Sequence, residues 1–240
     1  YFIFENFENY FDNKFVSDFS KIKLFYGFSF CDKYENYLKL RIGKNANVAV
    51  VGGEYNKSKI DFIENLLKNK STVLLGGEVS AMFSYVYINR ILKKNKVNTK
   101  TNNRLHSLLM KYKKNIILPT DFLVGKNKYK NEEIIRKNIL DIKLSDYIFD
   151  IGPESIKKYL GYIKKSNILI WSGLLGMVED KKFSNSSLMM AEIFCNKAKG
   201  KAFGVVVGNR TCKFIMDNKF GEDVDYLFFE KDTFYNLIKR

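Results

Sequence analysis

The sequence contains few of the residues that break, cross-link or hold metal in a chain. Among its 240 residues are 2 prolines and 15 glycines, while 46% are hydrophobic and 15% aromatic, a composition that argues against long disordered stretches. Cys31, Cys195 and Cys212 are widely spaced and odd in number, and His106 is the sole histidine. A disulfide framework and a zinc site are therefore poorly supported, no metal ligands are expected, and the thiols fit a reducing, cytoplasmic compartment.

Long apolar runs are also missing. No stretch reaches the ~18 apolar residues that a membrane-spanning helix needs, so the sequence predicts no membrane span. The chain begins with Tyr1 rather than methionine. We expect the native N-terminus to lie upstream, where any targeting signal would also lie.

Acidic residues are outnumbered, since 41 lysines and arginines stand against 26 aspartates and glutamates, for a formal charge of +15. Such a balance is typical of proteins that bind nucleic acid or anionic membranes. The lysines are nevertheless spread through every segment, and two clusters, within 93–96 and 111–114, fall at expected helix ends or loops, where solvated lysines are ordinary. No nucleic-acid-binding motif accompanies them, so a basic assembly or nucleic-acid-binding scaffold stays open as an alternative.

Short β-branched and apolar runs alternate with segments of helical spacing from residue 45 onward. Strands are expected at 47–51, 72–75, 115–118, 167–171 and 202–207, and helices at 60–67, 82–92, 105–112, 155–163 and 188–198. A short element is expected at 134–139, and the run at 147–149 leads into Asp150-Ile151-Gly152-Pro153. Repeated strand–helix units predict a mainly parallel sheet with helices on both faces and right-handed crossovers. The fold class is therefore α/β, a three-layer α/β/α Rossmann-like domain.

Several expected strands end in glycine, as at Gly52-Gly53, Gly76-Gly77, Gly173 and Gly208. Ligands of open α/β sheets bind beyond the carboxyl ends of the strands, and glycine lets a ligand approach the backbone there. Glycine also simply ends strands in such folds, so both interpretations stay open. Neither a complete P-loop nor a GxGxxG motif follows any strand.

Five segments, taken in order, are similar to motifs of one enzyme family. They are Val50-Val51-Gly52-Gly53 with Lys59-Ile60, Leu74-Leu75-Gly76-Gly77, Leu118-Pro119-Thr120-Asp121, Asp150-Ile151-Gly152-Pro153-Glu154-Ser155 and Trp171-Ser172-Gly173-Leu174-Leu175-Gly176. They resemble GGAKVSDKI, LIGGG, LPVD, DIGPES and WNGPMG of the phosphoglycerate kinase family. The resemblance is colinear over residues 24–240.

The resemblance implies a division into domains and a reaction. Residues 1–23 would be a remnant of the family's N-terminal substrate domain, 24–44 the interdomain helix and 45–240 the C-terminal nucleotide-binding domain. Family members transfer a phosphoryl group between 1,3-bisphosphoglycerate and ADP in glycolysis, with Mg-ATP/ADP as the nucleotide. The implied partners are an adenine nucleotide and either another protein or the missing N-terminal half.

Some of the family's nucleotide-binding positions are kept. Lys59 corresponds to the second lysine of AKVSDK and would reach a nucleotide phosphate. Glu179 corresponds to the acidic residue that binds the ribose hydroxyls. Gly208 and Thr211 correspond to positions of the GGGDT turn.

Other family positions are changed to residues of different chemistry. Tyr55 replaces the first lysine of AKVSDK, Arg210 the metal-holding aspartate of GGGDT, and Glu230 a glycine of the late GGGA turn, with Lys231-Asp232-Thr233 following. Glu78 and Ile148 replace base-pocket glycines, and Ser172 the asparagine of WNGP. On the acidic-substrate side, Glu8 stands where an arginine belongs, and Lys21-Ile22-Lys23 replaces a His-Arg pair.

Because the protein contributes mainly charge neutralisation and alignment to phosphoryl transfer, these exchanges predict a degenerate, catalytically impaired homologue: a pseudoenzyme or binding scaffold. One alternative is a divergent but active phosphoglycerate kinase whose other half lies upstream or in another chain. The other is the basic scaffold named above, which would bind with a steep salt dependence.

Overall fold

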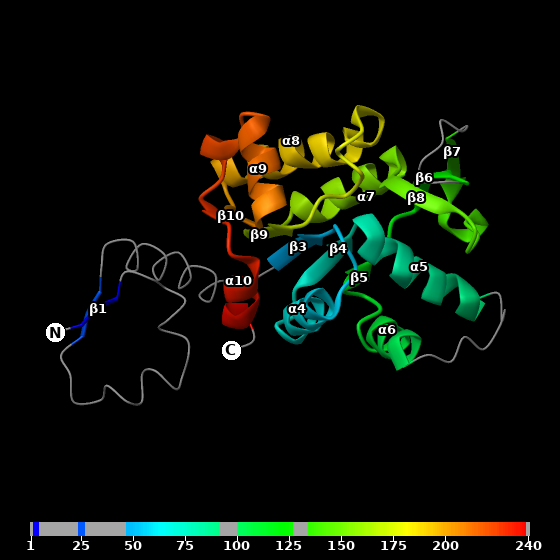
Figure 1. Cartoon of the computed structure of the whole chain (residues 1–240), viewed down its shortest axis with the longest axis horizontal. Helices are drawn as coiled ribbons and strands as arrows, with labels where there is room; N and C mark the ends of the chain where they lie inside the picture. Colours follow the sequence, from blue (N-terminus) through cyan, green and yellow to red (C-terminus); the bar gives the residue numbers. More distant parts are fainter. Residues whose placement is uncertain (1, 5–23, 27–46, 92–99, 127–133, 239–240) are drawn as a thin grey trace.

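The computed structural model describes residues 2–4, 24–26, 47–91, 100–126 and 134–238. Its centre is a six-stranded sheet in the order β11-β10-β9-β3-β4-β5 (Figure 1). Every neighbouring pair in this sheet is parallel. The strands are β3 (Asn47–Val51), β4 (Thr72–Leu75), β5 (Ile116–Ile117), β9 (Ile168–Ser172), β10 (Phe203–Val207) and β11 (Tyr226–Phe228).

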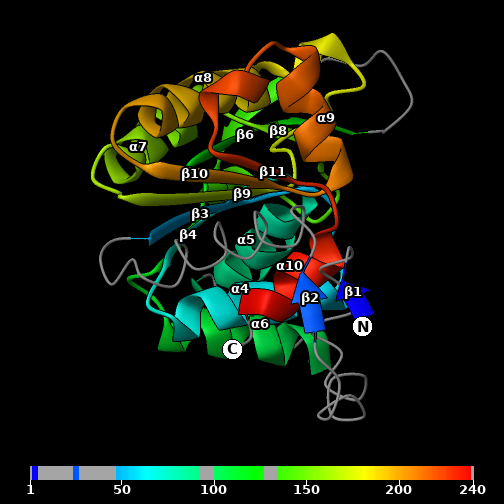
Figure 2. The same ribbon diagram turned by 90° about the vertical axis from the view of Figure 1, so that its left-hand side faces the viewer.

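Helices cover both faces of this sheet, as Figure 2 shows edge-on. The helices of one face are α4 (Lys57–Lys68), α5 (Gly77–Ile91), α6 (Lys100–Lys111) and α10 (Lys231–Ile238), and those of the other are α7 (Pro153–Ile163), α8 (Asn185–Gly200) and α9 (Asn209–Asp217). The predicted three-layer α/β/α architecture is confirmed. Lys111, Lys113 and Lys114 lie at and just beyond the end of α6, exposed, as expected for solvated lysines.

The strands are apolar on both sides because each side packs against a layer of helices. All five residues of β9 are buried, and along β3 alternate side chains enter opposite cores: Ala49 and Val51 face α4 and α5, while Val48 and Val50 face α7 and α8. Trp171 of β9 is fully buried and donates its indole N–H to Gly173 O at 2.9 Å. This strand-end tryptophan is therefore a core residue.

A second, smaller sheet differs from the predicted pattern. It joins β6 (Asp121–Gly125), β7 (Ile135–Asn138) and β8 (Tyr147–Ile151) in the order β7-β6-β8, with antiparallel pairing throughout. The run at 147–149 therefore belongs to β8, outside the parallel sheet, and pairs with β6; the sequence predicted neither strand. The predicted short element at 134–139 is present as β7, followed by a 3-10 turn (Ile139–Asp141).

The N-terminal part of the described chain consists of β1 (Phe2–Phe4) and β2 (Leu24–Tyr26), which pair in parallel. Residues 27–44 of the predicted interdomain helix lie outside the described residues, as do Glu8, Lys21 to Lys23, Cys31 and the lysine cluster within 93–96. The domain boundaries at 23 and 44 therefore stay predictions. In the part of the chain that is described, none of the helices combines the length and apolar character needed to cross a membrane.

Candidate functional site

The carboxyl ends of β3, β9 and β10 lie at one edge of the parallel sheet, where a ligand site is one of the two interpretations that the sequence leaves open. Gly52 N donates to Ser172 O at 3.0 Å and Gly53 N to Leu174 O at 2.7 Å, so the loops after β3 and β9 are hydrogen-bonded backbone to backbone. A Cβ on Gly52 would lie 2.2 Å from Leu174 O, and one on Gly173 would lie 2.2 Å from Gly52 O. These two glycines are required by contact between loops rather than by an approaching ligand.

Gly208 is different. It has a φ of 94° and caps α9 without a side chain. A Cβ there would meet only the Lys231 Cβ, at 3.7 Å. Among the strand-ending glycines, this one leaves the backbone of a helix N-terminus open to an approaching group.

Lys59 lies at this edge, as the resemblance implies. The side chain comes from the first turn of α4, whose N-cap Asn56 accepts a hydrogen bond from the Lys59 backbone N–H at 2.9 Å. The ammonium is buried, with the residue 7% exposed, and donates to Gly52 O at 2.6 Å. Burial, together with the positive charges of Lys231 and Arg210, lowers the pKa of Lys59 to about 8, while Glu54 opposes the shift.

Glu179 and Arg210 form an ion pair with each other. A second guanidinium nitrogen of Arg210 lies 3.7 Å from a Glu54 carboxylate oxygen. Arg210 thus links the loops after β3, β9 and β10 across the sheet edge. The carboxylate predicted to bind ribose is engaged by Arg210, the residue that the resemblance aligns with a metal-holding aspartate.

Thr211 and Ser172 are also engaged within the protein. The Thr211 hydroxyl oxygen accepts from Gly173 N at 2.9 Å, and Thr211 is buried. The Ser172 hydroxyl is 2.7 Å from the hydroxyl of Tyr235 in α10, and both residues are buried. Both side chains therefore fix the loops and α10 in place instead of facing an open ligand site.

The predicted base-pocket positions are filled by side chains. The Glu78 carboxylate, in the first turn of α5, accepts from the Tyr55 backbone N–H at 3.0 Å. Tyr55 packs against the core beneath α4 and α5, and Ile148 packs against the core of the opposite face. The structure therefore places these residues in packing and loop contacts.

The sequence did not indicate Lys231 as a residue of this edge. Lys231 is the first residue of α10 and follows the exposed Glu230. Its Cβ faces Gly208, and its charge acts on Lys59. The signal in the sequence was a lysine between two acidic residues, Glu230 and Asp232, in the late glycine turn.

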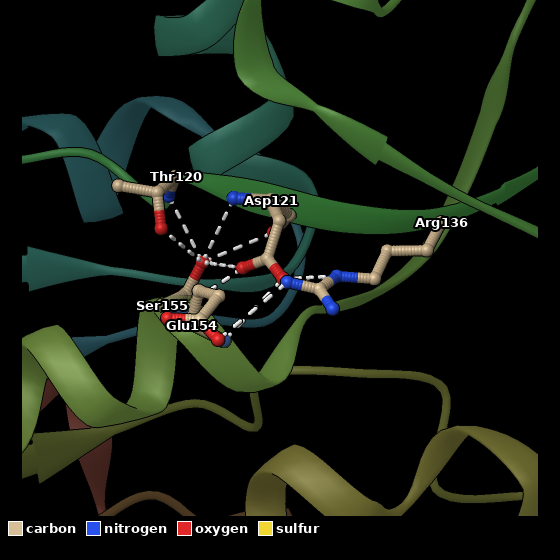
Figure 3. Close-up of polar contacts among 5 residues, drawn as sticks. All are labelled: Thr120, Asp121, Arg136, Glu154 and Ser155. Carbon is tan, nitrogen blue, oxygen red and sulfur yellow. Dashed lines mark hydrogen bonds and ion pairs between the residues drawn. The ribbon is translucent and has the colours of Figure 1, made fainter.

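Away from this edge, the LPTD and DIGPES segments meet through Asp121 and Ser155 (Figure 3). The buried Asp121 carboxylate accepts from Ser155 N at 2.8 Å, from Ser155 Oγ at 2.7 Å, from Glu154 N at 3.3 Å and from Arg136 Nε at 2.7 Å. Because Gly152, the residue before α7, offers no capping side chain, Asp121 caps that helix from β6. These hydrogen bonds fix the start of α7 against β6, and they leave the Asp121 carboxylate fully engaged.

The residues at the sheet edge do not fit a magnesium ion. The resemblance places Arg210 at the family's metal-holding position, and both nearby carboxylates, Glu54 and Glu179, pair with its guanidinium. Over the described residues, no group of three or more His, Cys, Asp or Glu side chains could hold a metal. Magnesium needs oxygen ligands, which a guanidinium cannot supply.

Comparison with known proteins is consistent with this arrangement of motifs. The phosphoglycerate kinase of Wigglesworthia glossinidia brevipalpis is 30% identical over 207 residues, covering 85% of this chain and 51% of that protein. That of Buchnera aphidicola subsp. Acyrthosiphon pisum (strain Tuc7) is 31% identical over 188 residues, covering 78% of this chain and 46% of its own length. The chain therefore spans about half the length of these curated relatives.

A solved structure of phosphoglycerate kinase from Coxiella burnetii shares the fold, with a TM-score of 0.79 at 21% identity, covering 94% of this chain and 58% of that one. A family model described as phosphoglycerate kinase matches residues 16–239. On this match, the chain belongs to the phosphoglycerate kinase family.

Proposed function

We propose that this chain is a degenerate phosphoglycerate kinase homologue that does not transfer phosphoryl groups at a useful rate, and that it serves as a binding protein built on the family fold. The observation that carries the proposal is the ion pair between Arg210 and Glu179. It engages a kept nucleotide-binding position with the side chain that replaces the metal ligand.

Loss of the metal is the first physical reason. In phosphoryl transfer the metal bridges phosphate oxygens and neutralises the charge that develops on them. Arg210 and the two carboxylates beside it form a closed set of ion pairs at that place. A protein cation there can attract an anion, but it does not coordinate phosphate oxygens as an octahedral ion does.

Loss of a second cation is the next reason. Tyr55 stands where a family lysine would carry a fixed charge, and it packs against the core. Removing one preorganised electrostatic donor typically slows an enzyme by about 100- to 1000-fold. Losing the lysine and the metal site together therefore reduces turnover below what a coupled assay detects against background.

Obstruction of the nucleoside site is the third reason. Glu78 reaches the Tyr55 backbone, and Ile148 fills the other base-pocket position with a branched apolar side chain. Both add bulk where the family's glycines leave room. We therefore expect adenosine to contribute little to the binding of any ligand at this edge.

The test is a coupled assay of the 240-residue chain, alone and mixed with the N-terminal domain of an active family member, which serves intact as the positive control. We expect no turnover above background in either mixture. Turnover near ~100 s⁻¹, the range of working kinases, would establish the alternative of a divergent active enzyme, which Lys59 favours by its kept position.

The affinity of the chain for Mg-ADP provides a second test of the proposed function. Calorimetry with Mg-ADP should give no micromolar affinity for the unaltered chain. Arg210→Asp should create measurable magnesium-dependent ADP binding, because it releases Glu179 and restores an oxygen ligand. Lys213→Asp, at an exposed position of the same helix, makes the same change of charge and should not.

A further inference from the structure

Lysines gather at the amino edge of the six-stranded sheet, opposite the edge described above. Helices α4, α6, α7 and α8 all end there, and loops lead from them to β4, β5, β9 and β10. Aspartate and glutamate are absent from the four connecting segments, which are 66–71, 110–115, 161–167 and 197–202. The lysines of these segments, which we call the amino-edge lysines, are Lys68, Lys70, Lys111, Lys113, Lys114, Lys164, Lys165, Lys197, Lys199 and Lys201.

The strand order places the four loops in a row. β10 and β9 are neighbours, β4 and β5 are neighbours, and β3 alone separates the two pairs. Because neighbouring strands lie about 4.8 Å apart, the row from β10 to β5 extends about 19 Å along the sheet. Lys197 Nζ donates to Lys164 O at 3.0 Å, so the ends of α7 and α8 are in contact. The amino-edge lysines therefore form a band along this edge.

The band faces solvent and keeps most of its charge. All of the amino-edge lysines are exposed except Lys197, which is half-buried. Lys68 pairs with Glu64 at 3.0 Å, and Lys199 pairs with Asp223 at 2.9 Å. No carboxylate of the described residues lies within 4.0 Å of the other members of the band. Since like charges repel, a polyanion at this edge would relieve a repulsion that the protein itself leaves in place.

The helix ends account for only part of the band. A lysine in the last turn of a helix is stabilised by the partial negative charge of the terminal carbonyls, and this effect falls off within that turn. More than half of the amino-edge lysines lie beyond the last residue of their helix, namely Lys70, Lys113, Lys114, Lys164, Lys165 and Lys201. Compensation of helix dipoles therefore does not explain why lysine stands at these positions.

Lys70 occupies a position that favours glycine. It follows Asn69 at the end of α4 with a φ of 61°, and its backbone N–H donates to Leu67 O at 3.0 Å. Glycine is the usual residue there, because a Cβ is strained in the left-handed conformation. In the described chain the one other non-glycine residue with positive φ is Lys219, which follows α9 at the same edge. Lysine is thus kept at this edge at a cost to stability, which favours a role for its charge.

The chemistry of the partner follows from the side chains that accompany the lysines. Tyr112 and Tyr162, the aromatic residues of the four segments, are only partly exposed, so a platform for stacking unpaired bases is not supported. Stable attachment to an anionic membrane takes an apolar insertion or a lipid anchor besides basic residues. Met110 is the one large apolar side chain of these segments that is exposed. The band is therefore suited to the phosphate backbone of a duplex.

We propose that the amino-edge lysines form a surface that binds double-stranded nucleic acid through its phosphates, without reading its sequence. Duplex DNA carries one negative charge per about 1.7 Å of axis, so a length of about 19 Å presents about as many phosphates as the band has lysines. DNA and RNA duplexes share this backbone chemistry. The surface does not depend on the loss of kinase activity, because it lies at the opposite edge of the sheet from the altered positions.

The test is fluorescence anisotropy of the 240-residue chain with labelled DNA and RNA duplexes of about 20 base pairs and arbitrary sequence, at about 50 to 200 mM salt. We expect saturable binding with a dissociation constant in the micromolar range at about 50 mM salt, which weakens steeply as salt is added. The two duplexes should bind with similar affinity, because contacts to phosphates carry no sequence information.

A quadruple variant removes one charge from each loop: Lys70→Gln, Lys114→Gln, Lys165→Gln and Lys201→Gln. It should weaken binding at least about tenfold and reduce the slope of log affinity against log salt by up to about 4. The matched control makes the same change of charge at exposed lysines elsewhere, Lys143→Gln, Lys181→Gln, Lys182→Gln and Lys213→Gln. It should alter the affinity by less than about twofold at about 100 mM salt, where distant charges are screened.

Lys70→Gly separates binding from folding. The substitution relieves the left-handed backbone and removes one charge, so the variant should unfold at a higher urea concentration than the unaltered chain and bind the duplex more weakly. A variant that bound weakly because it was damaged would unfold at a lower urea concentration.

Four results would each overturn the surface. They are an absence of saturable duplex binding, equal affinity of the quadruple variant and the unaltered chain, tighter binding of single-stranded DNA than of the duplex, and association with phosphatidylserine–phosphatidylcholine vesicles at salt concentrations that abolish duplex binding. None of them bears on the proposed function. Kinase turnover, which would remove the proposed function, would leave this surface in place.

Discussion

Arg210 and Glu179 are paired across the carboxyl edge of the sheet, one from the start of α9 and the other from the loop after β9. The resemblance to the family implies that both positions would face a nucleotide, one through a metal and one directly. Here they face each other. Under the proposed function, the guanidinium at position 210 therefore affects two positions: its own and that of Glu179, which it engages.

Lys59 makes the unfolding free energy of the protein vary with pH in the alkaline range. Its pKa is lowered from 10.5 to about 8 by burial and by Lys231 and Arg210, so the folded chain binds fewer protons than the unfolded chain between these values. The destabilisation is fully present below pH 8 and is relieved as the pH rises toward 10.5. Lys59→Met should raise the unfolding free energy at pH 7 by up to about 3 kcal/mol.

Urea unfolding of both proteins from pH 7 to 10.5 measures this effect. The difference between Lys59→Met and the unaltered chain should shrink as the pH rises, because the remaining lysines and tyrosines are common to both. A difference that is constant over this range would show that Lys59 carries no buried charge.

Asp150 should make the unfolding free energy decrease with rising pH in the mildly acidic range, the opposite of the effect of Lys59 at alkaline pH. Burial raises its pKa from 3.8 to about 7, against the hydrogen bonds from Ser186 and Ile151. The folded chain thus holds a proton that the unfolded chain releases, and this contribution to stability decreases as the pH rises from about 4 to 7. Asp150→Asn should flatten that part of the profile in chemical denaturation, whereas an unchanged slope would refute the assignment.

Asp121 should be among the most sensitive acidic residues for stability. Its carboxylate caps α7 and accepts from Ser155, Glu154 and Arg136 while almost fully buried. Asp121→Ala removes the cap and leaves buried donors unpaired, so the unfolding free energy should fall by about 3 kcal/mol. Asp141→Ala, at an exposed position, should change it by less than about 0.5 kcal/mol; comparable losses would contradict the capping role.

Ser172 and Tyr235 offer a measurable link between β9 and α10. Their hydroxyls are 2.7 Å apart, and the tyrosine ring stacks on Phe62 with centroids 4.0 Å apart. Tyr235→Phe keeps the stacking and removes the hydrogen bond, for an expected loss of about 1 kcal/mol. A double-mutant cycle with Ser172→Ala should return a coupling energy of similar size, and a coupling near zero would mean that the pair does not hold α10.

The sequence predicted the buried strands with accurate bounds because their residues are apolar on both sides. β3 and β4 coincide with the predicted runs at 47–51 and 72–75. β6 was missed because its five residues begin with Asp121 and end with Gly125, so they do not form an uninterrupted apolar run. The pairing of β8 with β6 could not be predicted, since it depends on a tertiary contact between segments about 25 residues apart.

Within the site, residue types were predictable and orientations were not. Glu179 and Arg210 were both identified from the resemblance, yet they are 31 positions apart and nothing in the sequence indicates that they pair. Lys231 lies between two acidic residues, Glu230 and Asp232, so the sequence around it indicates no net positive charge. The approach of its Cβ to Gly208 joins the start of α10 to the start of α9, and only the fold determines it.

The contact between Gly52 and Gly173 has a consequence for how this protein could have changed over time. Each of these positions excludes a side chain because the other loop's backbone lies 2.2 Å from where a Cβ would stand. The fold therefore requires glycine at both positions, whether or not the protein catalyses a reaction at this edge of the sheet. Reactive side chains at this edge could therefore be substituted one by one while the backbone of the loops after β3 and β9 kept its conformation. The same backbone would then be available to a different ligand.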